Sequence, residues 1–438
     1  MIIDFSVKNF RSFKDLQTIS FATTGLKSAE KYADIDKNNI VNIEDVQLFK
    51  TIGIYGANAS GKSNIIKALV YFVKAITNEP SSESNMSSLC DPFLYQDCEE
   101  DSYFQITLMI NKKKYRYGFT VKQNTQDIGS IDEKISKEKI SKEKISKEII
   151  TNEWLFGVKE KNMGEFFTRK GNKISNDKLP NKDKIPPLPY EHALYLTHAA
   201  AFDRNGVCQK IRNFFTGFVV SNLYNDHESF RWYSIFYLKS ENQKKQFLNL
   251  LSSFNLKYED ATLLDEEESS KKNIFPQNKI LLSKKYTNSN YEISDINLNL
   301  QKNESSGTQK LFDLAGLLLT AYNLSSSALI ILDEIDSNFH PYLLIKLIEF
   351  FNNPSVNKSN SQLLFTSHDT NLMSPSIMRR DQFYLTEKNE DNSTRLYSLA
   401  DLKGIRNDAD FAKQYLAGYY GALPILEDYL QINNSKDD

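Results

Sequence analysis

The chain of 438 residues is long enough for two or three domains and a sizeable core. Hydrophobic residues make up 40% and charged residues 25%, which excludes a disordered or fibrous protein. A formal net charge of -2 excludes a generally basic nucleic-acid-binding protein, although a local basic groove stays open. No apolar run reaches the ~18 residues of a membrane span, no signal peptide is evident, and the three cysteines form no CxxC pair, so we expect a cytoplasmic protein that contacts no membrane.

The N-terminal half reads mainly as strands. Alternating apolar residues in the first 22 positions predict a β-hairpin. Residues 48–55 predict a short buried strand, and residues 64–76 predict an amphipathic helix. Two strands around a turn at Asn111 are expected within residues 102–121. Further strands are expected at 149–158 and 164–169, followed by a linker at 180–189.

A repeat, ISKEKISKEKISKE, occupies residues 135–148 within a low-complexity stretch at 130–150. Its isoleucines recur every five residues, a spacing that places them on one face of neither a helix nor a strand. We therefore expect a solvated insertion at a hairpin tip that arose by tandem duplication, with a binding role as the alternative.

The C-terminal half alternates helices and strands. Residues 206–270 are mostly helical in pattern, and strands return near 279–286 and 291–300. The pattern then predicts a helix at 309–324, a buried strand at 328–332, a helix at 341–352, and strands at 362–366 and 382–386, before a helical C-terminus. Alternation of this kind favours a parallel α/β sheet.

A phosphate-binding loop is the strongest motif in the chain. It reads Gly56-Ala57-Asn58-Ala59-Ser60-Gly61-Lys62-Ser63 and fits the pattern G-x-x-x-x-G-K-S between a predicted strand and a predicted helix. Glycines let backbone N–H groups curl around phosphate oxygens at a helix N-terminus. Lys62 would reach the β- and γ-phosphates, and the Ser63 hydroxyl would ligate Mg²⁺. The alternative, a chance match, is disfavoured by the flanking elements.

An acidic pair follows the buried run Leu329–Leu332. Asp333 would hold Mg²⁺ and Glu334 would deprotonate an attacking water, because ligands gather at the carboxyl ends of strands in α/β sheets. An isolated acidic pair is weak evidence, but with the phosphate loop it indicates a nucleotide site. Lys62 and Asp333 lie in opposite halves of the chain, so a large insertion must separate the two half-sites.

Two further segments are candidates. Residues 304–310, with Ser305 and Gly307, form a second Ser/Gly-rich helix start, which is either an ordinary N-cap or an anion-binding end. His368 follows the predicted strand at 362–366 and is either structural or part of the site.

The order of these motifs resembles the ABC-type ATPases of the SMC and RecF group. A closer resemblance is to bacterial abortive-infection AAA-type ATPases, the AbiL/RloA and PARIS AriA relatives. The residues that carry it are Lys8–Phe13, Gly56–Ser63, Asp91–Phe93, Tyr115–Phe119, Ser305–Thr308, Asp333–Asp336, His340–Pro341, His368 and Tyr415–Pro424. The likeness extends to about residue 426 and leaves out the repeat and parts of 206–300.

This resemblance implies a homodimer that sandwiches ATP and Mg²⁺, with higher oligomers left open. Ser305 and Gly307 would contact the γ-phosphate bound by the other subunit. The resemblance also implies nucleotide contacts by Arg11, Asn64 and Asp336, and a switch role for His368. Its signature reads S-S-G-T here, Gln96 is the nearest Q-loop candidate, and Tyr419 stands where relatives often have Arg.

The implied fold class is α/β, an ABC/SMC-like P-loop ATPase head with a mixed sheet, a β-rich lobe and an inserted helical and β arm. We expect an N-terminal ATPase lobe at 1–205, a mainly helical insertion at 206–278, and a C-terminal ATPase lobe at 279–438.

Three functions are compatible with these motifs. The first is a Mg²⁺-dependent ATPase that acts as sensor and switch in anti-phage defence and controls a separate Toprim-type nuclease or toxin in response to a phage-encoded trigger. The alternatives are a RecF-like repair ATPase that binds duplex DNA and a nucleotide-locked scaffold. Two basic clusters remain, Lys112–Lys114 and Arg379–Arg380. Each either binds phosphates or is simply solvated, and in that second case Arg379–Arg380 would be a pair at a helix C-terminus.

Overall fold

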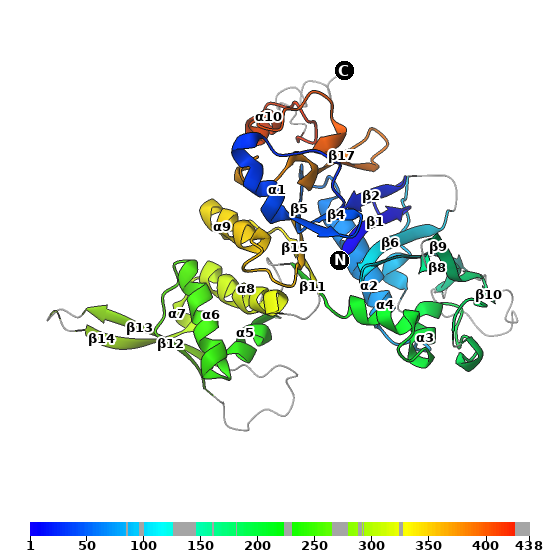
Figure 1. Cartoon of the computed structure of the whole chain (residues 1–438), viewed down its shortest axis with the longest axis horizontal. Helices are drawn as coiled ribbons and strands as arrows, with labels where there is room; N and C mark the ends of the chain where they lie inside the picture. Colours follow the sequence, from blue (N-terminus) through cyan, green and yellow to red (C-terminus); the bar gives the residue numbers. More distant parts are fainter. Residues whose placement is uncertain are drawn as a thin grey trace, which may run out of the picture.

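A computed structural model of the chain describes two β-sheet lobes and a projecting arm (Figure 1). The described residues are 1–84, 86–95, 100–125, 146–159, 162–180, 182–222, 230–264, 279–287, 291, 293–323 and 327–424. Gln96 and most of the repeat lie outside them.

The central sheet has six strands, most of them parallel. Their order is β11 (Phe218–Asn222), β15 (Leu329–Asp333), β16 (Gln362–Thr366), β5 (Thr51–Gly56), β17 (Phe383–Lys388) and β18 (Thr394–Ser398), with only β18 antiparallel to its neighbour. Strands β5, β15 and β16 are buried along their whole length, as near-continuous apolar runs favour in a parallel sheet. The predicted parallel α/β sheet is therefore confirmed.

Helices cover both faces of this sheet. Ile52 and Ile54 pack with α2 (Lys62–Thr77), whereas Tyr55 and Phe365 point to the opposite face and join the core of α8 (Ser306–Asn323) and α9 (Pro341–Asn352). Side chains alternate along a strand, so the two faces have separate cores.

The second sheet forms the β-rich lobe and is antiparallel throughout. Its seven strands run in the order β10 (Lys173–Ser175), β9 (Asn162–Lys170), β8 (Ser146–Lys159), β7 (Lys113–Thr125), β6 (Ser102–Ile110), β1 (Ile2–Lys8) and β2 (Gln17–Ser20). Helix α2 lies between the two sheets: the Phe72 ring stacks on Phe119 at 5.3 Å and meets Phe5 edge-on at 5.5 Å.

Two hairpin predictions are confirmed in this lobe. Strands β1 and β2 pair, and β6 and β7 pair around Asn111 and Lys112, both of which have positive φ. Strands β7 and β8 also form a hairpin, in which Thr125 is the partner of Ser146. The last residues of the repeat, from Ser146, begin β8, and the expectation for the rest of the repeat lies outside the described residues.

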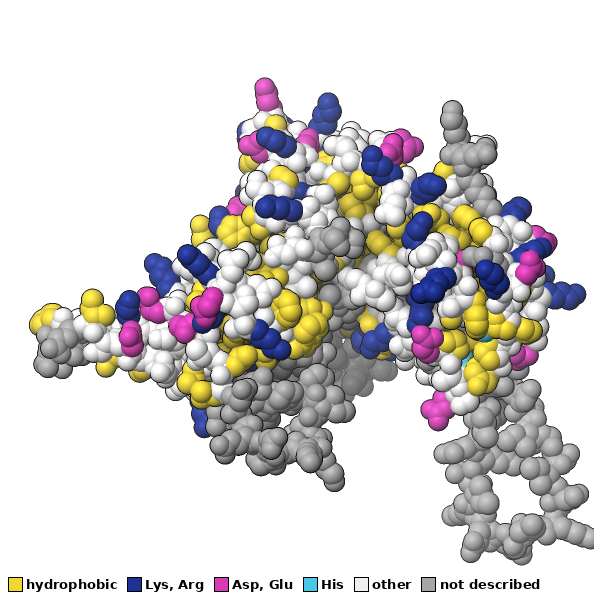
Figure 2. All heavy atoms as spheres, turned by 60° about the horizontal axis from the view of Figure 1, so that its bottom comes forward, with side chains coloured by type: hydrophobic (Ala, Val, Ile, Leu, Met, Phe, Trp, Pro, Cys, Tyr) yellow, Lys and Arg dark blue, Asp and Glu magenta, His cyan; other side chains and the backbone are white. Residues whose placement is uncertain are grey.

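The arm is built on helix α8. It contains α5 (Arg231–Leu238), α6 (Glu241–Ser253), α7 (Leu300–Asn303) and a sheet of β12 (Asp260–Leu264), β13 (Lys279–Thr287) and β14 (Ile293–Asn299). Phe247 and Phe312 join the arm's own core. Figure 2 shows hydrophobic side chains at its outer end, where Tyr291 is 91% exposed. The expected boundary after residue 278 falls between β12 and β13, which pair with each other, so the strands at 279–299 pack with the helices before them.

The remaining elements connect these parts. They are α1 (Ala33–Asn39), β3 (Ile40–Ile43), β4 (Val46–Phe49), α3 (Tyr195–Phe202), α4 (Val207–Phe215), α10 (Phe411–Leu416) and the short 3-10 helices at 30–32, 87–89, 182–184, 370–372, 380–382 and 399–401.

One strand prediction is wrong in detail. Residues 48–55 form the end of β4 and most of β5, with a break at Lys50. Its buried ammonium donates to the carbonyls of Asn38 and Asn352 at 2.8 and 2.9 Å, at the point where the chain passes from the sheet of β4 to that of β5.

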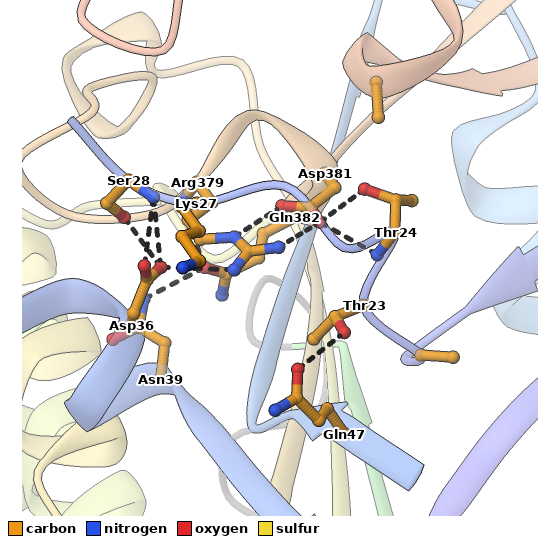
Figure 3. Close-up of polar contacts among 12 residues, drawn as sticks. Thr23, Thr24, Lys27, Ser28, Asp36, Asn39, Gln47, Arg379, Asp381 and Gln382 are labelled. Atoms are coloured by element: carbon orange, nitrogen blue, oxygen red, sulfur yellow. Dashed lines mark hydrogen bonds and ion pairs between the residues drawn. The ribbon is translucent and has the colours of Figure 1, made fainter. Parts of the chain in front are cut away.

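A buried polar cluster ties the N-terminal segment to the last third of the chain (Figure 3). Arg379 lies at its centre, with Nε 2.9 Å from Asp381 Oδ1 and Nη1 3.1 Å from Asp36 Oδ1. Thr24 and Ser28 donate their hydroxyls to the same two carboxylates. The two carboxylates neutralise the buried guanidinium.

The prediction of a helix C-terminal pair at Arg379–Arg380 is therefore wrong. Arg379 precedes a 3-10 helix, and Arg380 donates to the carbonyl of Ile405. Both side chains are engaged within the fold instead of forming an exposed phosphate-binding patch.

Among the described residues, no helix is both long and apolar enough to cross a membrane.

Candidate active site

Three parallel strands end together at one edge of the central sheet. Thr366 at the end of β16 lies beside Ile54 of β5 in the ladder, and Phe365 lies beside Leu332 of β15. The carboxyl ends of these strands therefore bring together the phosphate loop after β5, the acidic pair after β15 and His368 after β16. Ligand sites form at this edge in open α/β sheets.

The phosphate loop needs its two glycines. Gly56 has φ of 147°, and a Cβ there would lie 2.4 Å from the carbonyl oxygen of Thr386. Gly61 has φ of 108° and directly precedes α2, and a Cβ there would lie 2.5 Å from Thr394 Oγ1. Ala59 also has positive φ, while Asn58 and Ala59 are exposed and Ser63 is half-buried in the first helical turn. These glycines allow the tight curvature of the loop, within which the Ser60 N–H donates to the Ala57 carbonyl at 3.3 Å.

Lys62 folds back over this loop. Its Nζ donates to the carbonyls of Gly56 and Ala57 at 2.8 and 2.9 Å. Burial lowers the pKa of Lys62 to about 8, although nearby carboxylates, Asp333 first among them, act in the opposite direction. The site thus holds an ammonium that an anion would stabilise.

Neighbouring hydroxyls brace the loop from behind. Ser60 Oγ lies 2.6 Å from Thr386 Oγ1 of β17, and Thr394 Oγ1 of β18 donates to the Ser60 carbonyl at 2.8 Å. Ser12 Oγ lies 2.8 Å from Thr394 Oγ1 and accepts from the Asn64 amide, also at 2.8 Å. Asn64, expected as a nucleotide contact, therefore binds the N-terminal segment. Thr386 and Thr394 were not among the predicted site residues, although Thr386 lies in a predicted strand at the same edge.

The acidic pair is held by β16. Asp333 is 6% exposed, and its Oδ1 accepts the hydroxyl hydrogen of Thr366. The backbone N–H of Glu334 donates to the same Thr366 hydroxyl at 2.8 Å, and Glu334 has φ of 53°. Thr366 was also missed, because nothing in its local pattern separates it from other strand residues.

Asp336 and His368 lie on the turns beside this pair. The His368 backbone N–H donates to Asp336 Oδ1 at 3.3 Å, and the imidazole is exposed. Desolvation and the charge of Lys62 lower the pKa of His368 below its usual 6.5, against the opposing effect of Asp336. The ring is therefore mostly neutral at pH 7.

The Ser/Gly-rich segment at the start of α8 packs against the turn after β15. Ser305 is exposed and accepts from the Thr308 N–H at 3.2 Å, which makes it a helix cap. A Cβ on Gly307 would lie 2.8 Å from the Asn338 carbonyl, so this glycine permits a close approach. Lys310, one turn later, donates to Ser337 Oγ at 3.2 Å.

Arg11 lies beside α2 and is paired with Asp91. Its Nε is 2.9 Å from Asp91 Oδ2, and its guanidinium lies over the ring of Tyr71 at 5.8 Å. Two segments that carried the family resemblance, Lys8–Phe13 and Asp91–Phe93, thus contact each other.

The C-terminal segment Tyr415–Pro424 also reaches the site. The Ala57 N–H donates to the carbonyl of Ala422 at 3.0 Å, and Tyr397 OH donates to the carbonyl of Tyr420 at 2.7 Å. Tyr419 is exposed on this loop. The segment therefore supports the phosphate loop, a contact that no spacing argument could anticipate.

A comparison with models of protein families agrees with these motifs. A family model described as "AAA domain, putative AbiEii toxin, Type IV TA system" matches residues 52–374, more than half of the chain and both half-sites. No curated protein matches the chain. Among solved structures, the chain is similar to the recombination mediator protein RecF in its ATPrS form, from the RecFOR pathway. Identity is 12%, coverage is 90% of this chain and 98% of that chain, and the TM-score is 0.32.

Proposed function

This chain belongs to the AAA-domain ATPase family whose model spans both of its half-sites, and from that premise we propose that it binds ATP with Mg²⁺ and hydrolyses it. The observation that carries the proposal is the meeting of Lys62, Asp333 and Glu334 at one sheet edge, although they come from opposite halves of the chain.

The residues fit a hard divalent cation and a polyphosphate. A buried carboxylate at Asp333 and a hydroxyl at Ser63 are oxygen donors of the kind that Mg²⁺ prefers. Bound there, Mg²⁺ would neutralise charge on the phosphates. The backbone of Gly56–Ser63 would cradle the phosphates, and Lys62 would exchange its loop carbonyls for phosphate oxygens.

Glu334 is the general base in this proposal. It follows the buried Asp333 directly, and its left-handed backbone turns the chain at the sheet edge. It would accept a proton from the attacking water. His368, mostly neutral at pH 7, would hydrogen-bond the terminal phosphate from the neighbouring strand end.

A second subunit completes the site in our proposal. Ser305 and Ser306 are exposed at the start of α8, where helix N–H groups and the local dipole favour an anion. A homodimer that sandwiches two ATP molecules would place each of these helix starts against the other subunit's terminal phosphate. ATP would then control assembly, because it binds the dimer more tightly than the separated subunits.

We further propose that this switch serves abortive infection. The family description names a toxin and a toxin–antitoxin system, which supports a pairing with a separate toxin. A Toprim-type nuclease is the other effector in our proposal. A phage-encoded trigger would change the ATP-dependent assembly and release the effector. DNA binding by the ATPase itself is an outcome that salt-dependent affinity measurements would reveal.

The test compares the wild type with Glu334→Gln and Lys62→Ala. We expect Mg²⁺-dependent ATP turnover only in the wild type, and an ATP-dependent doubling of mass that is most stable in Glu334→Gln. Glu349→Gln, an exposed change on α9, is the matched charge control and should behave as wild type. The same masses are measured with the product of the neighbouring gene.

Three outcomes would count against parts of the proposal. A monomer under all conditions would refute the sandwich. Equal turnover in Glu334→Gln and wild type would refute the role of Glu334. Absence of any complex with the neighbouring product would refute control of that effector.

A further inference from the structure

The hydroxyl of Thr366 lies between the two acidic residues of the site. We propose that Thr366 is a positioning residue that sets the carboxylate of Asp333 and the backbone of Glu334 together. This inference rests on the proposed ATPase function and assigns a role to a residue that touches neither phosphate nor metal.

The hydrogen-bond roles at Thr366 are unambiguous. A hydroxyl has one hydrogen to donate, and the ionised Asp333 can only accept, so the hydrogen goes to Asp333 Oδ1. A lone pair of the same oxygen then accepts the Glu334 N–H at 2.8 Å. Donating to a carboxylate polarises the hydroxyl, so the two bonds fix each other's direction.

The burial of this pair makes the hydroxyl hard to replace. Thr366 is 0% exposed and Asp333 is 6% exposed. Water therefore has little access to the carboxylate oxygen that Thr366 binds, and removing the hydroxyl would leave that oxygen without this donor.

The hydrogen bond from the Glu334 N–H to the Thr366 hydroxyl stabilises the backbone conformation of Glu334. A non-glycine residue at φ of 53° is strained and persists only where the surroundings hold it. The Glu334 N–H is bound by the Thr366 hydroxyl, and the Ile335 N–H is bound by the Thr366 carbonyl at 3.0 Å. One residue thus anchors the turn that aims the general base.

Thr366 is itself held from both sides. Strand β16 pairs with β15 on one edge and with β5 on the other, and Thr366 is the partner of Ile54, two residues before Gly56. Its Oγ1 is therefore fixed relative to both the acidic pair and the phosphate loop. The pairing of β16 with β15 and β5 sets the spacing between the two half-sites, and the Thr366 hydroxyl ties the acidic pair to that frame.

The role predicts a specific kinetic signature. Thr366 acts through Asp333, the proposed metal ligand, so losing its hydroxyl weakens Mg²⁺ retention and turnover more than ATP binding. A charge-assisted hydrogen bond corresponds to a change of about tenfold.

The experiment uses Thr366→Val, which keeps the shape and removes the hydroxyl, and Thr366→Ser, which restores it. Thr51→Val is the matched control: it removes a buried threonine hydroxyl on β5 that donates to Asn352 Oδ1, at the opposite end of the same sheet. The Mg²⁺ concentration for half-maximal turnover, kcat, the KM for ATP and Tm are measured for all four proteins.

For Thr366→Val we expect a rise of about tenfold in half-saturating Mg²⁺ and a fall of about tenfold in kcat, with the KM for ATP within about twofold at saturating Mg²⁺. Thr366→Ser should recover most of the loss, and Thr51→Val should leave the Mg²⁺ dependence unchanged even if its Tm falls.

The inference is overturned if Thr366→Val lowers only Tm, or if its Mg²⁺ dependence matches that of Thr51→Val. Failure of the ATPase proposal can be told apart from failure of this inference, because in the first case the wild type itself would show no Mg²⁺-dependent turnover.

Discussion

Nucleotide affinity should depend on pH through Lys62. Burial lowers the pKa of this ammonium to about 8 in the free protein, where it donates only to neutral carbonyls. Bound phosphates would raise the pKa again by direct charge pairing. Binding therefore takes up a proton at pH values between the two pKa values, and affinity is full below about pH 8 and declines above it.

The magnitude follows from that pKa. The unprotonated fraction of Lys62 grows with pH, so the Kd for MgATP should rise about 16-fold between about pH 8 and about pH 9.5. At about pH 8 each bound nucleotide should take up about half a proton. Titration calorimetry in buffers of different ionisation enthalpy measures both quantities. Lys62→Met should bind weakly and with no linked proton uptake.

A Kd that stays flat between about pH 8 and about pH 9.5, together with no proton uptake, would refute this reasoning. Lys62 would then keep its charge in the free protein, and its loop carbonyls would be adequate solvation for the ammonium.

Three further changes test other parts of the structure. Gly421→Ala places a Cβ 2.8 Å from Glu387 Oε1 at φ of 73°. We therefore expect the free energy of unfolding to fall by about 1–3 kcal/mol, measured by thermal unfolding, and nucleotide binding to weaken. An unchanged Tm would show that the loop relaxes freely. Arg379→Met leaves the buried Asp381 carboxylate without its guanidinium. We expect this change to lower the free energy of unfolding by about 3–5 kcal/mol, measured by urea unfolding. An unchanged free energy of unfolding would show that the cluster tolerates an apolar side chain. Deletion of residues 140–144, one unit of the repeat, should leave ATP turnover and Tm unaltered, and lost turnover would give the repeat a role in the site.

Local sequence patterns predicted the helices and strands whose ends are marked by residues within or next to them. Residues 341–352 and 362–366 form α9 and β16 as predicted, because Pro341 occupies the first helical position after the capping His340, and β16 is a short apolar run. The phosphate loop was recognisable because its spacing encodes the turn itself. The expected α/β class, with a mostly parallel central sheet, a β-rich lobe and an inserted arm, is confirmed.

Non-local contacts were beyond such signals. Strand β11 lies in a stretch predicted as mostly helical and is stabilised by parallel pairing with β15, more than one hundred residues later. Thr366, Thr386 and Ala422 act at the site through partners that only the folded chain brings near. Spacing could name the residues that would bind phosphate, but not those that hold them in place.

The place of β5 in the central sheet has a consequence for synthesis on the ribosome. Thr51 pairs with Leu363, and Gly53 pairs with Phe383. The strands that pair with both edges of β5 are therefore synthesised late in translation. The antiparallel lobe closes on earlier strands, whereas β5 stays an apolar strand with two open edges while most of the chain emerges. Such long-range pairing folds slowly and exposes strands to aggregation. Nascent chains of this protein should therefore depend on chaperones until its last third has been made.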